Sequence, residues 1–329
     1  MTHLHSWSPI PRGSHFSLAN IPFGIISTST STEPRVATAI GDNAFDLAAF
    51  AAHNGFSALS TIQPFQKVFS EPTLNAFAAL GQTIHSVVRK YIQDIFLTST
   101  SYPDILKENK ELQKICLIPL KDIRNHIPFQ IGDYTDFYAG LNHASNCSKI
   151  FNRPMQPNYK HLPVAYHGRA SSVVISGTPI RRPTGQILPE PGKPPVFSEC
   201  KKLDFELELG CFVCKGNKMG EPVDVNEAET HLFGVVMMND WSARDIQMWE
   251  MIPLGPLNSK NFGTTISPWV VLIEALQPFR VQGIPNDQKL LPYLQEMKKD
   301  NVVDIKLSVD ITSKSYIISV VATNLMLIR

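Results

Sequence analysis

The sequence has almost no net charge and lacks any long hydrophobic run. Its 329 residues carry 30 Lys and Arg against 29 Asp and Glu, which gives a formal net charge of +1 at pH 7. Since no block of basic residues stands out, nothing indicates nucleic acid or an anionic membrane as a partner. No apolar stretch approaches the roughly 18 residues of a spanning helix, and residues 1–9 lack the charged and apolar regions of a signal peptide. We therefore expect a cytoplasmic protein.

Cysteine is also scarce. The five residues are an odd number and lack the spacing of a disulfide framework. Cys211 and Cys214 have the Cys-x-x-Cys spacing of redox or zinc sites, but no second pair accompanies them. They continue an apolar strand pattern that begins after Glu208. We interpret the five cysteines as buried structural thiols.

A 43% hydrophobic composition at this length can bury a sizeable core, and we expect two domains, residues 1–126 and 127–329. The first contains a predicted hairpin over 36–47 that turns at 41–43. A helix is predicted from Pro72 and Thr73 onward, because apolar residues between 77 and 95 recur at helical spacing. The second domain is rich in strand patterns and has proline-containing loops at 179–195 and 253–256.

Apolar and acidic residues alternate over 203–209 with the two-residue period of a strand. The alternation places Phe205, Leu207 and Leu209 toward a core. Glu206 and Glu208 then share the opposite face, roughly 7 Å apart. Two carboxylates at that separation repel each other and need a cation, a shared proton or bulk water. A half-solvated strand is the ordinary explanation, and a functional pair of acids is the alternative.

A buried strand is predicted over 233–238, and it runs into Asp240. A helix follows, for which Ser242 is the predicted N-cap and Asp245, three residues on, completes a weak capping box. A polar residue at a strand end commonly faces a site, which makes Asp240 a candidate.

Helical spacing after Asp240 puts Arg244, Gln247 and Met251 on one face. An arginine and an amide beside an acidic cluster either bind an anionic substrate or neutralise the acids. The residues alone leave both interpretations open.

A further polar segment spans 131–138 and precedes His143. Its acids follow neither a helical nor a strand period. If this segment were helical, Asp136 and His143 would lie two turns apart. Because lone histidines are usually structural or solvated and this chain has ten, spacing alone assigns no role to His143.

Four long sequence blocks follow one another between residues 132 and 269. They read Gly-Asp-Tyr-Thr-Asp-Phe-Tyr (132–138), Leu-Pro-Val-Ala-Tyr-His-Gly-Arg-Ala-Ser-Ser (162–172), Met-Asn-Asp-Trp-Ser-Ala-Arg-Asp-Ile-Gln (238–247) and Phe-Gly-Thr-Thr-Ile-Ser-Pro-Trp (262–269). In this order they resemble the fumarylacetoacetase, or fumarylacetoacetate hydrolase, family, whose reaction ends tyrosine degradation. The resemblance runs from near residue 20 to near residue 324.

The resemblance implies a mainly β fold with added helices. Its first domain would be a small SH3-like β-barrel with helices. Its second would be a mixed β-roll whose cavity holds a metal and which forms a homodimer contact.

The resemblance also implies the residues of the site. The metal ligands would be Asp136, Glu206, Glu208 and Asp240. His143 would be the base that activates water, with Arg244, Gln247 and Lys260 as further catalytic groups, and the substrate contacts would be Tyr138, Arg153, Tyr166, Arg244, Gln247 and Thr264. Four carboxylates form a hard oxygen site, which favours Ca²⁺ and also admits Mg²⁺.

The implied reaction is the hydrolysis of a carbon–carbon bond in a 1,3-diketo acid, 4-fumarylacetoacetate, to fumarate and acetoacetate. Related enzymes that use Mg²⁺ to decarboxylate or isomerise keto acids are the alternative chemistry. The presence of His143 together with Arg244 and Gln247 argues against it.

Three departures from the family pattern bear on activity. A hairpin is predicted over 302–311 and 316–323, after which the family continues with a Gly-Thr-Ile-Ser-Gly-like segment and a glutamate that orients the catalytic histidine. We therefore expect a second domain that is incomplete at its C-terminus, and a truncated, inactive homologue that retains metal or dimer-partner binding is the alternative to an active enzyme. Met251 replaces a substrate-binding tyrosine, and Arg153 matches a family arginine only after a one-residue shift.

Overall fold

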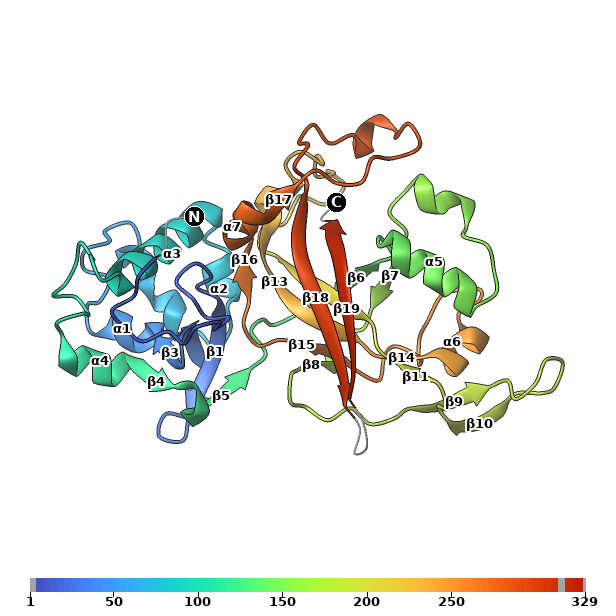
Figure 1. Cartoon of the computed structure of the whole chain (residues 1–329), viewed down its shortest axis with the longest axis horizontal. Coiled ribbons are helices and arrows are strands. Elements are labelled where there is room, and N and C mark those ends of the chain that lie inside the picture. Colours follow the sequence, from blue (N-terminus) through green and yellow to red (C-terminus); the bar gives the residue numbers. More distant parts are fainter. Residues whose placement is uncertain (1–3, 313–316, 328–329) are drawn as a thin grey trace.

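The N-terminal part of the computed structural model is built on one antiparallel sheet of five strands (Figure 1). The structure describes residues 4–312 and 317–327. The strand order is β4-β3-β2-β1-β5. The strands are β1 (Phe23–Thr28), β2 (Arg35–Ile40), β3 (Asn43–Asp46), β4 (Leu117–Pro119) and β5 (Ile123–His126). The hairpin predicted over 36–47 is confirmed, because β2 pairs with β3 and Ile40 lies opposite Asn43.

The helix predicted from Pro72 is divided into two. The helices of this part are α1 (Leu47–Ala52), α2 (Asn75–Ala78), α3 (Gln82–Phe96) and α4 (Lys110–Cys116). Gly81, the N-cap of α3, has a φ of +84°, a left-handed conformation that ends the first helix and suits a residue without a Cβ atom. The apolar stripe is nevertheless buried, since Phe77, Val88 and Ile95 are all fully covered.

The second part consists of a larger sheet and several small ones. The larger sheet has the order β12-β13-β15-β8, with β16 also paired to β13. Its strands are β8 (Val173–Ile175), β12 (Leu207–Val213), β13 (Leu232–Asp240), β15 (Thr264–Ile266) and β16 (Val271–Leu272). The two-stranded sheets are β6 (Tyr134–Phe137) with β7 (Ala165–Gly168), β9 (Thr184–Ile187) with β10 (Val196–Glu199), and β11 (Leu203–Asp204) with β14 (Ser242–Ala243).

A three-stranded sheet contains the long hairpin that crosses the middle of Figure 1. It joins β17 (Arg280–Val281), β18 (Val302–Thr312) and β19 (Ile317–Leu327). The hairpin predicted over 302–323 is thus found, although Tyr316 lies outside the described residues. The helices of this part are α5 (Leu141–Ile150), α6 (Arg244–Glu250) and α7 (Ile273–Leu276). Short 3₁₀ helices are η1 (Gln63–Ser70), η2 (Leu120–Asp122), η3 (Pro157–Lys160), η4 (Ala170–Ser172), η5 (Ala228–His231), η6 (Gln277–Phe279) and η7 (Pro292–Leu294).

One hydrophobic core connects the two parts. Phe233 of β13 is buried in the same cluster as Phe77, with their ring centroids 5.8 Å apart. Phe23 and Val270 exchange backbone hydrogen bonds of 2.9 and 2.7 Å. Removing a buried phenylalanine side chain costs about 3–5 kcal/mol. The mixed α/β fold is therefore held together by packing across the junction of its two parts.

The cysteines are all free, but they are not all buried. Cys116, Cys147 and Cys200 are buried as predicted, whereas Cys214 is half-buried and Cys211 is exposed. Because neighbouring side chains of β12 point to opposite faces, Cys211 lies on the face opposite to Phe212, which packs against the core. The prediction of a buried thiol at position 211 was wrong. Among the described residues, no helix is both long and apolar enough to cross a membrane.

Candidate active site and metal centre

Strands β12 and β13 and the residues just before β12 bring three of the acidic residues together. Glu208 lies on β12, Asp240 ends β13, and Glu206 lies between β11 and β12. The pairing of β12 with β13 places Glu208 opposite Met238, and Asp240 donates its backbone N–H to the Glu206 carbonyl at 3.1 Å. Asp136 comes from β6, which pairs with β7.

Glu206 is the more deeply buried of the two alternating acids, with 7% of its surface exposed. Alternation alone predicts that Glu206 lies on a half-solvated face. In the structure, two cationic side chains cover its carboxylate instead. Arg244 Nη1 lies 2.7 Å from Glu206 Oε1, and Lys260 Nζ lies 2.8 Å from Oε2. A buried carboxylate persists in the ionised form only with such partners.

Lys260 connects two of the predicted ligands. Its Nζ also lies 2.7 Å from Asp240 Oδ2, so one ammonium group bridges Glu206 and Asp240. Asp240 is 1% exposed and also accepts hydrogen bonds from Tyr166 at 3.3 Å and Thr264 at 3.5 Å. Asp136 lies close enough to Asp240 for the two carboxyl groups to affect each other's pKa.

The pKa values show how the charge of the cluster is distributed. Burial alone would raise the pKa of Glu206, but Lys260 and Arg244 outweigh it and lower this pKa to about 2. Burial and the neighbouring carboxylates raise the pKa of Glu208 to about 10. Burial and Asp240 raise the pKa of Asp136 to about 7. Without a further cation, the cluster therefore keeps protons on its acids near neutral pH.

This excess of acidic groups fits a hard divalent cation. The donors are oxygen atoms of carboxylates, which Ca²⁺ and Mg²⁺ prefer, and a bound cation would relieve the repulsion that raises the pKa of Glu208. His143, Glu206 and Glu208 each offer a ligand atom within 4.8 Å of one another. Among residues 4–312 and 317–327 this is the group of three or more such side chains that meets this spacing, and it includes the histidine rather than Asp136 or Asp240.

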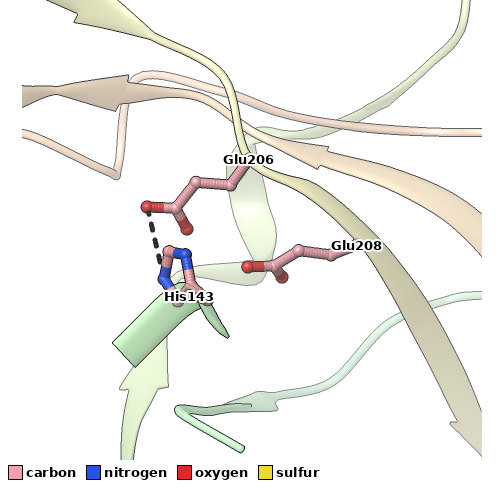
Figure 2. Close-up of side chains that lie close together, drawn as sticks. All are labelled: His143, Glu206 and Glu208. Carbon is pink, nitrogen blue, oxygen red and sulfur yellow. Dashed lines mark ion pairs between the residues drawn. The ribbon is translucent and has the colours of Figure 1, made fainter. Parts of the chain in front are cut away.

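His143 approaches the acids from helix α5, as Figure 2 shows. Its Nε2 lies 3.9 Å from Glu206 Oε1 and 3.6 Å from the Cys147 sulfur. Burial lowers the pKa of His143, although Glu206 opposes this effect. The imidazole is therefore held in its neutral form, which can accept a proton. Asp136 lies on a strand and not on the helix of His143, so the two-turn spacing has no structural counterpart.

Arg244 and Gln247 share one face of α6, as their spacing predicts. Arg244 Nη1 donates to Gln247 Oε1 at 3.0 Å, and both residues are 7% exposed. The predicted cap was wrong by one residue, because the N-cap is Ala243. Ser242 instead pairs with Asp204 in a short β-bridge and donates its hydroxyl to the Asp240 carbonyl.

Tyr138, Met251 and Arg153 are the remaining positions that the family resemblance singled out. Tyr138 stacks edge-on against His143, with ring centroids 5.5 Å apart. Met251 follows α6 one turn beyond Gln247 and donates its backbone N–H to the Gln247 carbonyl. Arg153 is exposed in the loop after α5, and its side chain makes no hydrogen bond or ion pair with any described residue of the acidic cluster.

Sequence reasoning missed three residues beside the site. Asp204 accepts a hydrogen bond of 2.8 Å from Arg244 Nε, and Tyr134 hydrogen-bonds with Thr264. Cys147 lies beside His143. Asp204 shares the two-residue period of Glu206, and Cys147 follows His143 by four residues, one helical turn; those spacings were the available signals. No local pattern indicates Tyr134.

Comparison with known proteins gives a consistent family assignment. Residues 19–128 match the family model described as fumarylacetoacetase N-terminal, and residues 134–316 match the one described as fumarylacetoacetate (FAA) hydrolase C-terminal. The fumarylacetoacetase of Aspergillus fumigatus is 61% identical over 316 residues, which cover 94% of this chain and 73% of that protein. The fumarylacetoacetases of Homo sapiens (46% over 309 residues; 93% and 72%) and Arabidopsis thaliana (44% over 314 residues; 94% and 73%) are also similar.

Proposed function

This chain belongs to the fumarylacetoacetase family, and from that premise we propose that it hydrolyses the carbon–carbon bond of 4-fumarylacetoacetate to fumarate and acetoacetate. This is a hydrolase reaction on a small diketo acid, and it ends tyrosine and phenylalanine degradation. The observation that carries the proposal is the buried cluster in which Glu206 contacts Lys260 and Arg244 and lies 3.9 Å from His143.

The acidic residues Asp136, Glu206, Glu208 and Asp240 would hold the metal, for which we propose Ca²⁺ with Mg²⁺ as a second possibility. Their oxygen donors support a hard cation. When bound, such a cation supplies Lewis-acid polarisation of a carbonyl group. The closeness of His143 to Glu206 and Glu208 supports the same location for the site.

His143 would act as the general base. Because burial lowers its pKa, the imidazole is neutral and can take a proton from a water molecule. The water oxygen then bonds to the carbonyl carbon of the substrate. The bond between that carbon and the carbon that becomes part of acetoacetate then breaks. The departing carbanion takes up the proton that His143 removed from water, so atoms and charge balance and the imidazole returns to its neutral form.

Arg244, Gln247 and Lys260 would stabilise the negative charge that develops on oxygen and on the departing carbon. Tyr138, Tyr166 and Thr264 would contact the substrate, because they surround His143 and Asp240. Arg153 is a weaker candidate and needs its loop to turn inward. Removing one donor of this kind typically lowers the rate by about 10²–10³.

We further propose a division into an SH3-like barrel domain over 1–126 and a β-roll domain over 127–329, a homodimeric assembly and a cytoplasmic location. The five-stranded N-terminal sheet and the separate sheets of the second part support the division. The resemblance to the family supports the dimer and the location.

Turnover of 4-fumarylacetoacetate by the purified chain tests the proposal. We expect Ca²⁺-dependent activity that is removed by a chelator. His143→Ala should lower the rate by about 10²–10⁴, the usual contribution of general base catalysis. His161→Ala, at an exposed histidine, is the matched control and should leave the rate unchanged. An undiminished rate in His143→Ala would exclude the base assignment, and Ca²⁺ binding without turnover would favour the inactive homologue.

A thermal melt tests the metal site separately from turnover. A metal that binds the native state raises the melting temperature, with about 2.7 kcal/mol of stabilisation at a concentration 100 times the Kd. Millimolar Ca²⁺ should raise the transition of the chain. Glu206→Gln should remove this response, whereas Glu221→Gln, at an exposed acid, should retain it.

A further inference from the structure

Three serine or threonine residues in the sequence are followed directly by proline: Ser8, Thr178 and Ser267. Only Thr178 also has a basic residue, Arg181, three positions after it. A hydroxyl residue followed by proline and then by a basic side chain is the pattern that proline-directed protein kinases accept.

The structure separates these three residues by their accessibility. Thr178 and Pro179 are exposed. Ser8 is only 3% exposed, and the Ser267 hydroxyl is occupied, since it accepts a hydrogen bond of 3.1 Å from the Met237 backbone. Thr178 is therefore the candidate that an enzyme can reach in the folded chain.

The segment that follows Thr178 is irregular and is held at two points. Residues 178–183 form neither helix nor strand. The Ile180 side chain lies against Gly263, so closely that a Cβ at that glycine would meet Ile180 Cδ1 at 2.7 Å. Arg182 Nη1 donates to the Cys200 carbonyl at 2.8 Å. With these two anchors in place, Thr178, Pro179 and Arg181 remain exposed and lie outside any helix or strand.

Thr178 also borders a cleft between the two parts of the chain. The cleft has a volume of about 500 Å³ and is lined by residues 124–127, at the end of β5, and by residues 174–178, at the end of β8. Arg124 and His126 are two positions apart on a strand, so their side chains lie on the same face of β5. One wall of the cleft is thus basic and the other carries Thr178.

The basic wall has no acidic partner. Among residues 4–312 and 317–327, Arg124 forms no ion pair or side-chain hydrogen bond. His126 Nε2 is within 2.8 Å of the Ser27 hydroxyl, and its Nδ1 makes no hydrogen bond with any of the same residues. Burial and the nearby Arg124 charge lower the pKa of His126. An anion placed here would give the Arg124 guanidinium a partner, whereas His126, with its lowered pKa, would contribute a ring N–H donor rather than a charge.

We propose that Thr178 is a phosphorylation site of a proline-directed protein kinase, and that the phosphate binds Arg124 and His126 across the cleft. The Thr178 oxygen attacks the γ-phosphorus of ATP, an oxygen–phosphorus bond forms, and the bond to the ADP oxygen breaks. The hydroxyl proton passes to the base of the kinase. ATP and the kinase are the co-reactants.

Phosphothreonine would connect β5 of the N-terminal part to the turn after β8. A phosphate carries about two negative charges and three acceptor oxygens, and arginine binds it through two parallel N–H donors. Strand β8 pairs with β15, which begins at Thr264. The modification would therefore stiffen the junction of the two parts. It would alter no residue of the acidic cluster.

Incubation of the full folded chain with a proline-directed kinase and Mg²⁺-ATP, followed by peptide mass spectrometry, tests the first half of the proposal. We expect one phosphate, on Thr178, and none on Ser8 or Ser267. Thr178→Ala and Pro179→Ala should both abolish it. A folded chain that acquires no phosphate at Thr178 overturns the proposal.

Thermal melts of the phosphorylated and unmodified chains test the second half. Phosphorylation should raise the melting temperature by about 2–4 °C, and Arg124→Gln should remove this rise while leaving phosphate incorporation intact. Lys121→Gln removes an exposed basic residue of the same segment that does not line the cleft, and it should retain the rise. A rise that survives in Arg124→Gln, or no rise at all, excludes Arg124 as the phosphate ligand. Activity plays no part in either readout, so failure here is separate from failure of the proposed hydrolysis.

Discussion

Lys260 and Asp240 form a buried ion pair in which Nζ lies 2.7 Å from Oδ2 and the two side chains are 4% and 2% exposed. The same ammonium group contacts Glu206 at 2.8 Å. Burial alone would lower the pKa of Lys260, but Asp240 and Glu206 outweigh it and raise this pKa. Lys260 therefore stays charged and neutralises part of the acidic cluster when no metal contributes.

Lys260→Met should destabilise the metal-free chain. It leaves Glu206 and Asp240 as buried carboxylates short of a partner, a change that typically costs about 3–5 kcal/mol. Urea unfolding measures the loss, and added Ca²⁺ should restore part of it. Lys90→Met is the control, because Lys90 pairs with Glu274 at 3.4 Å with two thirds of its side chain exposed, and exposed pairs contribute less than about 1 kcal/mol. Equal losses in both variants would contradict the bridging role.

Calcium affinity should rise with pH. The pKa of Glu208 is raised to about 10 and that of Asp136 to about 7, so both carry protons in part or in full at pH 7. A carboxyl group must lose its proton to ligate a metal, so low pH opposes binding and binding releases protons. Calorimetry in buffers of different ionisation enthalpy counts these protons. Glu208→Gln should reduce the number released at pH 8 by about one, since a raised pKa keeps that group protonated before the metal binds.

His85 should make the stability of the chain fall in mild acid. It is 3% exposed, and its Nε2–H donates to the Phe77 and Ala78 carbonyls at 3.0 Å. Burial lowers its pKa despite these bonds. Below pH 6.5 the unfolded state therefore binds a proton that the folded state does not, so stability is lost as pH falls, by up to about 1.4 kcal/mol per pH unit.

Urea unfolding between pH 5 and 7 measures the His85 effect. His85→Phe should reduce the slope of stability against pH. Val88→Ala, in the same helix, should lower stability without changing that slope, because no titratable group is removed. Parallel pH curves for His85→Phe and the parent chain would show that His85 does not cause the loss.

Gly168→Ala should disturb the site through Tyr134. Gly168 lies directly opposite Tyr134 in the β6–β7 pair, and a Cβ atom there would collide with the tyrosine ring. Displacing Tyr134 breaks its hydrogen bond with Thr264, which in turn contacts Asp240. We expect a loss of about 1–3 kcal/mol, the usual cost of overpacking, and weaker Ca²⁺ binding. Gly132→Ala, where a Cβ meets nothing within 4 Å, should change neither quantity.

Local sequence pattern predicted several elements of the site correctly. The apolar run over 233–238 is the buried strand β13 that ends at Asp240, and the spacing of Arg244 and Gln247 put them on one helical face. These features depend on a period of two or of 3.6 residues, which the sequence itself carries. At Gly81, between α2 and α3, a single left-handed residue interrupts the helix, and the apolar period wrongly predicted one continuous helix.

The sequence by itself determined the family and the residue types of the site, because four long blocks and the alternation around Glu206 are properties of the chain. Only the tertiary structure decided how these residues meet. His143 and Glu206 are 63 positions apart, yet their side chains lie 3.9 Å from each other, and Lys260 comes from a loop to join Glu206 to Asp240. The burial that sets the pKa values of Glu206 and Glu208 in opposite directions arises from packing among separate strands and helices, and no local period encodes such packing.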